Sequence, residues 1–206
     1  MSQMANKLVI LDRDGTINVD RDDYVKSADE FEPLPGALEA IAQLNHAGFF
    51  VAVATNQSGL GRGLFDMAAL NAMHSKMNKL LAAVGGRIDA VFFCPHSPDE
   101  SCTCRKPLPG LYEQIGERLG LPLHDVPVVG DSLRDLQAAV VVGAQPHLVL
   151  TGKSATLRGQ PLPANFPAQQ PRMDRVVFFE INNVENVHPG ISRKQLAPIC
   201  PAGMAG

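Results

Sequence analysis

The sequence predicts a doubly wound parallel α/β domain with helices on both faces of the sheet. Three observations support this fold class. Short runs of consecutive apolar residues are typical of strands that are buried on both faces. Amphipathic helical segments alternate with these runs along the chain. Polar side chains follow several runs directly, at the strand ends where ligands bind in open α/β sheets.

The first strand is expected at Leu8-Val9-Ile10-Leu11, and it runs directly into Asp12-Arg13-Asp14-Gly15-Thr16. Residues 15 to 35 then form an acid-rich connection that is too long for a minimal strand-to-helix link. We therefore expect a loop that faces the substrate. The same connection is too short for an inserted cap domain, so the predicted fold is capless.

The other elements follow in a regular order. Helices are expected from Pro35-Gly36 to just before Gly48, over 66 to 84, over 110 to 119, and from Asp131, as a possible cap, to about Val142. The remaining strands are expected over 49 to 54, 90 to 93, 126 to 129 and 147 to 150.

The chain changes character after about residue 155. Seven of its sixteen prolines fall in the last 56 residues, where no helical periodicity is sustained. Residues 176 to 181 alone have the pattern of a strand there, and the sequence does not place it in the sheet. We therefore predict a catalytic domain over 1–155 and a Pro-rich tail of uncertain structure over 156–206.

Composition limits the possible functions. The chain has 206 residues, 45% of them hydrophobic, and a net charge of −3, as expected for one globular domain with a sizeable core. Residues 1 to 150 carry 12 Lys and Arg against 18 Asp and Glu, so this part lacks the basic footprint of a nucleic-acid-binding protein. No signal peptide or membrane span is evident, and we expect a cytoplasmic monomer with no membrane partner.

Asp12 and Asp14 suit a reaction in which one carboxylate attacks and the other moves protons. The simpler alternative is that Asp14-Gly15 is a turn and Asp12 a strand-end cap. Other predicted strand ends add Thr55-Asn56 and Asp131, with Asp135 one turn further on, and Lys106 follows the third strand after a loop. A phosphate facing carboxylates is repelled by about 4 kcal/mol per pair at about 4 Å and an effective dielectric of about 20, so a lysine and a divalent cation must offset that. Carboxylate oxygens suit Mg²⁺.

The cysteines indicate a second metal site. Cys94, His96, Cys102 and Cys104 supply three thiolates and an imidazole, the ligand set of a closed structural Zn²⁺ site, while Cys200 lies far away in the sequence. The single-residue gaps are tighter than usual finger spacing. Free buried thiols or a strained disulfide are the alternatives.

The motifs DRDGT at 12 to 16, Thr55, Lys106 and GDSLRD at 130 to 135 resemble those of haloacid-dehalogenase-like phosphatases. This resemblance covers residues 7 to about 153. It implies that Asp12 is the nucleophile that forms an aspartyl-phosphate, and that Asp14 protonates the leaving oxygen and then activates water. It further implies that Thr55 and Lys106 hold the phosphoryl oxygens, and that Mg²⁺ is bound by Asp12, the Asp14 main-chain carbonyl and Asp131.

The zinc loop before Arg105-Lys106-Pro107 is similar to that of D-glycero-D-manno-heptose-1,7-bisphosphate 7-phosphatases and the related histidinol phosphatases. The stretches INVDRDDYV and TNQSGLGRG are more similar to the heptose enzymes. The resemblance implies a phosphorylated sugar as substrate, a heptose precursor for lipopolysaccharide or surface polysaccharide, and a zinc ion that braces Arg105 and Lys106. The implied substrate-binding residues are Arg13, Asp20, Asp23, Tyr24, Asn56, Gln57, Ser58 and Arg105.

The sequence departs from this family in two places. Ser132 stands where some members have Lys, and the tail lacks the amphipathic helix expected to complete the sheet. Three alternative functions remain to be weighed. Histidinol-phosphate phosphatase is the main one. A receiver-like phospho-acceptor module does not need the second carboxylate, Asp14, and a mutase would need a cap to exclude water.

Overall fold

The computed structural model describes residues 7–157 and 177–179, and in this part the chain forms a parallel sheet of six strands in the order β3-β2-β1-β4-β5-β6. The strands are β1 (Leu8–Leu11), β2 (Phe50–Asn56), β3 (Ala90–Cys94), β4 (Pro127–Gly130), β5 (Gln145–Val149) and β6 (Val177–Phe179). Every pairing is parallel, and the register aligns Leu11 with both Val53 of β2 and Val129 of β4. The predicted fold class is confirmed.

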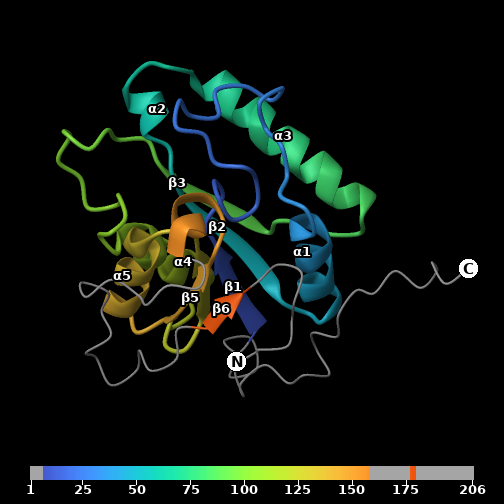
Figure 1. Cartoon of the computed structure of the whole chain (residues 1–206). Coiled ribbons are helices and arrows are strands. Elements are labelled where there is room, and N and C mark those ends of the chain that lie inside the picture. Colours follow the sequence, from blue (N-terminus) through green and yellow to red (C-terminus); the bar gives the residue numbers. More distant parts are fainter. Residues whose placement is uncertain (1–6, 158–176, 180–206) are drawn as a thin grey trace, which may run out of the picture.

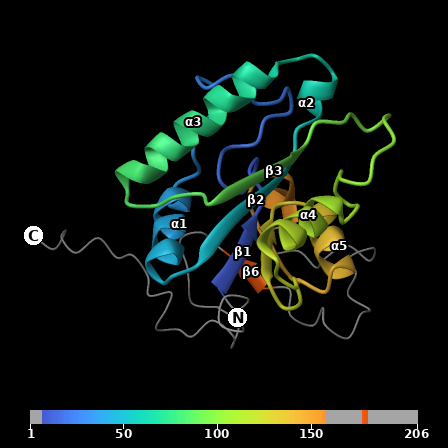
Figure 2. The ribbon, with the colours of Figure 1, turned by 180° about the vertical axis from the view of Figure 1, so that it is seen from behind.

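Helices cover both faces of the sheet, as Figures 1 and 2 show from opposite sides. They are α1 (Ala37–His46), α2 (Ser58–Gly61), α3 (Met67–Ala83), α4 (Gly110–Leu119), α5 (Leu133–Val141) and the 3-10 helix η2 (Gly152–Leu157). Alternate residues of β1 serve the two faces: Val9 and Leu11 pack into the core beneath α1 and α3, while Leu8 and Ile10 pack into the core beneath α4. A strand buried in this way needs an unbroken apolar run, which explains the sequence at residues 8 to 11.

The chain changes direction across the sheet at β1. It passes from β1 outward through β2 to β3, and then returns to place β4 on the other side of β1. In doubly wound sheets the loops diverge at such a point and leave a crevice outside the carboxyl ends of the strands. Asp12 and Asp131 follow the two strands that flank this crevice.

The loop between β1 and α1 contains no helix or strand, in agreement with the capless prediction. It is nevertheless well packed, because Ile17, Val25 and Phe31 are buried in the same core cluster as α1 and α3. Its acidic residues are thus held on a loop with its own apolar anchors.

Most predicted elements are present with end shifts of one to three residues, and two details differ in ways that matter for the site. Strand β2 extends to Asn56, so Thr55 and Asn56 belong to the strand and do not follow it. The short helix α2 directly after it was not predicted.

Strand β6 lies within the stretch of 176 to 181 that had the pattern of a strand, and it pairs with β5. The division of the chain at residue 155 remains a prediction, because residues 158–176 and 180–206, Cys200 among them, lie outside the described part. Among the described residues, no helix has the length and apolar character required to cross a membrane.

The buried face of α3 provides a test of the packing. Met73 is fully buried in the core, whereas Met67 on the same helix is 43% exposed. Met73→Ala should lower the free energy of unfolding by about 2–5 kcal/mol because it leaves a cavity. Met67→Ala, the matched control, should change it by less than about 0.5 kcal/mol in urea denaturation. Equal losses for the two variants would contradict the packing of α3.

Candidate active site

A pocket of about 310 Å³ opens at the carboxyl ends of the central strands. Six aspartates and five basic side chains line it, a near balance of charge that suits an anionic ligand held beside a cation. The aspartates are Asp12, Asp14, Asp20, Asp22, Asp131 and Asp135, and the basic residues are Arg21, Arg105, Lys106, Arg134 and Lys153.

Lys106 is the buried cation of the pocket. Its side chain is 2% exposed, and its Nζ lies 2.9 Å from Asp12 Oδ1 and 2.5 Å from Asp135 Oδ1. The same ammonium donates a hydrogen bond of 2.7 Å to the carbonyl of Ala54. Burial alone would lower the pKa of Lys106, but the two carboxylates outweigh it and raise the pKa, so the ammonium stays charged.

The side chain of Asn56 fixes the backbone of Lys106. Its Nδ2 donates to the Lys106 carbonyl at 3.0 Å, and its Oδ1 accepts from the Lys106 N–H at 3.1 Å. We expected Asn56 to bind substrate. Asn56 lines the pocket, and both polar atoms of its amide also connect the end of β2 to the loop that carries the lysine. Its contact with substrate stays a prediction.

Asp14 is fixed by a different set of partners. Arg13 Nη2 lies 2.8 and 2.9 Å from its two oxygens, and Asn18 Nδ2 and Gln57 Nε2 each donate one further hydrogen bond. Burial tends to raise the pKa of Asp14, but the arginine and these donors outweigh it and hold the pKa below its ordinary value. Arg13 is fully buried and does not line the pocket, so its side chain positions Asp14, and the structure does not support its predicted contact with substrate.

The residues at the end of β2 and the start of α2 complete this side of the pocket. Gln57 Nε2 also donates to Thr55 Oγ1 at 2.9 Å, so one amide links Thr55 to Asp14. Thr55, Gln57 and Ser58 are all at most 7% exposed, and all three line the pocket where we predicted them to act.

Asp131 is held from the segment that follows β5. Its Oδ2 accepts a hydrogen bond of 2.6 Å from the backbone N–H of Lys153, and its carbonyl accepts one from the Ser154 hydroxyl. Gly15, with φ +78°, leaves room for the Asp131 carboxylate, since a Cβ at this position would clash with it. The prediction did not include this segment, because no motif marks it.

The prediction that Asp131 caps α5 is wrong. The N-cap is Ser132, which forms a capping box with Asp135: the Ser132 N–H and hydroxyl donate to Asp135 Oδ2 at 3.0 and 2.5 Å. The serine that departs from the family pattern therefore fixes Asp135, the second partner of Lys106. Asp131 stays directed to the pocket.

Asp12, Asp131 and Asp135 present oxygens within 4.8 Å of one another. Burial, together with the neighbouring carboxylates, raises the pKa of Asp12 to about 7 even though Lys106 lowers it. Burial, together with the carboxylates of Asp12 and Asp135, raises the pKa of Asp131 to about 8. One ammonium does not offset three carboxylates, and hard oxygen ligands fit Mg²⁺, so this donor set can hold that ion.

The acidic loop reaches the rim of the pocket. Asp20 and Tyr24 line it as predicted, and Tyr24 has φ +70°, an uncommon conformation for a bulky residue. Asp23 does not line the pocket; its carboxylate pairs with Arg21 and Lys26 within the loop. Its predicted contact with substrate is therefore not supported by the structure.

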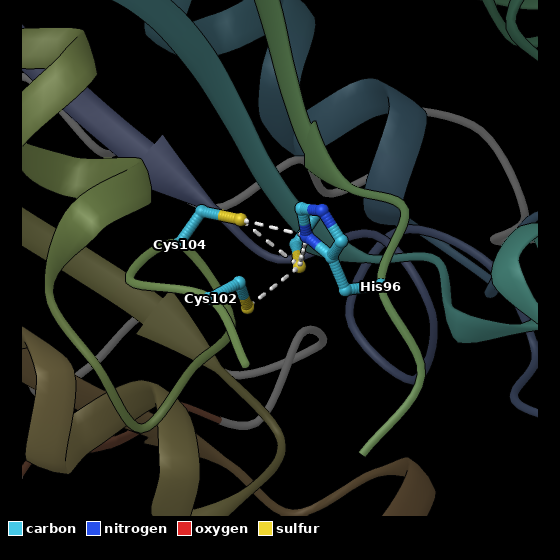
Figure 3. Close-up of side chains that lie close together, drawn as sticks. His96, Cys102 and Cys104 are labelled. Atoms are coloured by element: carbon cyan, nitrogen blue, oxygen red, sulfur yellow. Dashed lines mark hydrogen bonds between the residues drawn. The ribbon is translucent and has the colours of Figure 1, made fainter. Parts of the chain in front are cut away.

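Cys94, the last residue of β3, comes together with His96, Cys102 and Cys104 from the loop that follows, and Figure 3 shows these last three pointing toward one another. The sulfur of Cys94 lies 3.1 Å from that of Cys104 and 3.8 Å from that of Cys102, and His96 Nδ1 lies 3.4 and 3.5 Å from Cys104 and Cys94. Ligands of a tetrahedral Zn²⁺ lie about 3.5–3.8 Å apart, so three of these four separations match closely and the fourth is shorter. The three cysteines are free thiols, and no disulfide forms among them.

The zinc-type cluster connects directly to the pocket. Arg105 Nη1 donates to the backbone carbonyl of His96 at 3.2 Å, and Arg105 lines the pocket beside Lys106. An ion held by the four side chains would therefore also fix the carbonyl that orients this arginine.

Comparison with known proteins agrees with this site. The model of the haloacid dehalogenase-like hydrolase family matches residues 6–143, and the chain belongs to that family. The predicted superfamily is thereby confirmed, and with it the class of the protein, an enzyme that hydrolyses its substrate.

Individual relatives carry a more specific name. Proteins named D-glycero-beta-D-manno-heptose-1,7-bisphosphate 7-phosphatase from Pseudomonas aeruginosa and Bordetella bronchiseptica are 53% and 60% identical, over 78% and 71% of this chain and 90% and 82% of their own lengths. The crystal structure of the D,D-heptose 1,7-bisphosphate phosphatase from B. bronchiseptica, complexed with magnesium and phosphate, is 57% identical with a TM-score of 0.73. The two chains align over 77% of this chain and 89% of the B. bronchiseptica chain.

The raised pKa values of Asp12 and Asp131 predict how stability depends on pH. Both folded-state pKa values lie above the ordinary 3.8, so between about pH 4 and about pH 8 the folded protein keeps protons that the unfolded chain has already released. The metal-free protein should lose free energy of unfolding over that range. Stabilisation by Mg²⁺ should therefore be larger at pH 8 than at pH 5, because the ion competes with these protons.

Thermal unfolding with and without Mg²⁺ at the two pH values measures this effect. Asp131→Asn serves as the control, and in that variant most of the extra stabilisation at pH 8 should be absent. An equal benefit from Mg²⁺ at pH 5 and pH 8 in the unmodified protein would rule out the proposed coupling.

Proposed function

We propose that this chain is a Mg²⁺-dependent phosphatase that removes the C7 phosphate of D-glycero-D-manno-heptose 1,7-bisphosphate, in the supply of heptose for lipopolysaccharide or surface polysaccharide. The observation that carries the proposal is Asp12, a carboxylate at the end of the central strand that is ion-paired to the buried Lys106 and faces the pocket. Family membership supports the hydrolytic chemistry, and the relatives' names support the substrate.

In the first step a carboxylate oxygen of Asp12 attacks the phosphorus atom, and the bond between phosphorus and the C7 oxygen breaks. Lys106 and the Thr55 hydroxyl bind phosphoryl oxygens. Mg²⁺, which phosphatases of this family use, would be held by Asp12, Asp131 and the Asp14 carbonyl, and would neutralise charge on the phosphoryl group.

Asp14 donates a proton to the leaving C7 oxygen and then takes one from the water that releases phosphate from Asp12. In the free site Arg13, Asn18 and Gln57 favour its ionised form. A phosphate dianion that enters beside Asp14 raises its pKa, which is the direction a proton donor requires. The three partners meanwhile fix where the carboxyl group points.

Cys94, at the end of β3, is proposed to hold a structural Zn²⁺ together with His96, Cys102 and Cys104. This ion would fix the loop that carries Arg105 and Lys106. The monomeric state of the active enzyme stays a prediction. The cytoplasmic location stays a prediction.

Activity on the two candidate substrates distinguishes a heptose-bisphosphate phosphatase from a histidinol-phosphate phosphatase. Phosphate release from each, at equal enzyme and Mg²⁺ concentration, should favour the heptose bisphosphate in kcat/KM by at least about tenfold. A preference for histidinol phosphate would assign the chain to the alternative function.

The nucleophile assignment predicts that Asp12→Asn lowers turnover below about one-thousandth of the unmodified enzyme, because no covalent intermediate forms. Asp14→Asn should lower it by about 10²- to 10⁴-fold. Circular dichroism and zinc content, measured on the same samples, should be unchanged. Appreciable hydrolysis by Asp12→Asn would refute the assignment.

The metal assignment predicts about one zinc ion per chain after dialysis, since four closed ligands bind it tightly. Cys102→Ser should reduce zinc content and activity together, and Cys200→Ser, which keeps all four proposed ligands, is the matched control. Elemental analysis and phosphate release check this. A Cys102→Ser protein that lacks zinc and keeps full turnover would show that zinc does not brace the site.

A further inference from the structure

We propose that Lys153 is a positioning residue for substrate specificity. Its ammonium holds the acidic loop of residues 15–35 against the segment after β5 and offsets the loop's charge, so that a doubly phosphorylated sugar can bind. The inference rests on the proposed function, because it takes a sugar bisphosphate as the substrate.

The geometry of Lys153 joins two distant parts of the chain. Its Nζ lies 2.8 Å from Asp20 Oδ2 and 3.0 Å from Asp22 Oδ1, and all three residues line the pocket. Asp20 is the stronger partner, since its side chain is 18% exposed, whereas Asp22 is fully exposed and its pair is screened by solvent. In Figure 1 the turn after β5 lies at the same end of the sheet as the loop after β1.

The backbone and the side chain of Lys153 serve different residues. The backbone N–H donates to Asp131, and that contact does not depend on the side chain. The side chain alone reaches Asp20. A substitution that keeps the length of the side chain and removes its charge can therefore abolish the ion pairs with Asp20 and Asp22 while Asp131 keeps its hydrogen bond.

Charge explains why this matters for a bisphosphate. Asp20 and Asp22 both line the pocket, and Lys153 is the cation that pairs with each of them. Without Lys153, the ionised Asp20 and Asp22 would stand uncompensated at the rim that a polyanionic sugar must pass. Repulsion grows with the charge of the ligand, so a bisphosphate loses more binding than a small aryl phosphate with one phosphoryl group.

The test compares Lys153→Met and Lys153→Arg with the unmodified enzyme on heptose 1,7-bisphosphate and on p-nitrophenyl phosphate. Lys153→Met should raise KM for the bisphosphate about five- to tenfold, change its kcat less than about threefold, and change kcat/KM for the aryl phosphate less than about threefold. Lys153→Arg should keep KM for the bisphosphate within about twofold, because the charge remains.

Lys26→Met is the matched control. Lys26 also pairs with an aspartate of the acidic loop, Asp23 at 2.6 Å, but neither residue lines the pocket and the pair lies within the loop. This variant should leave KM for the bisphosphate within about twofold of the unmodified enzyme.

Hydrogen exchange of the free protein provides a measurement that needs no substrate. Backbone amides of residues 17–25 should exchange faster in Lys153→Met than in Lys153→Arg. Failure of the unmodified enzyme to hydrolyse the bisphosphate would reject the proposed function and leave the loop contact to be judged by exchange. Unchanged exchange and unchanged KM in Lys153→Met, or equal losses on the two substrates, would overturn the role of Lys153.

Discussion

The ion pairs of one buried lysine hold the candidate site together. The side chain of Lys106 is almost fully buried. Its charge is tolerated there because it pairs with the carboxylates of Asp12 and Asp135. Each partner is fixed in turn, Asp135 by the capping box of Ser132 and the lysine backbone by the amide of Asn56. The orientation of Asp12, the candidate nucleophile, is therefore set by the packing of three strands and one helix.

The two carboxylates of the first motif have opposite environments, although they are two residues apart. Asp12 has Lys106 and two further carboxylates near it, and its pKa is raised to about 7. Asp14 has an arginine and two amide donors, and its pKa is lowered. Groups whose surroundings differ in this way are suited to different tasks. Under the proposed mechanism, Lys106 would stabilise Asp12 as the attacking carboxylate, and the partners of Asp14 would fix the direction in which it moves a proton.

The sequence was sufficient to predict the fold class, the first five strands and which polar residues follow them, because these depend on local signals, whereas the strand order and the pairing of β6 came from the structure. Leu8 to Leu11 had to be buried on both faces, and the polar residues that follow β1 and β4 had to meet at one edge. The contacts that fix those residues could not be predicted in the same way. Asn56 and Lys106 are 50 residues apart, and Lys153 and Asp20 are more than 130 residues apart. Contacts over such separations leave no recognisable pattern in the local sequence. Arg13 shows the same limit, since a buried arginine and a substrate-binding arginine look alike in a motif.

The central claim is that this arrangement makes Asp12 the residue that receives the phosphoryl group. Rapid acid quenching of the enzyme during turnover of the bisphosphate, followed by mass spectrometry of its peptides, tests it directly. The account predicts a phosphorylated peptide with the modification on Asp12. Phosphate on another residue, or free phosphate that accumulates with no phosphorylated enzyme at any time, would contradict it.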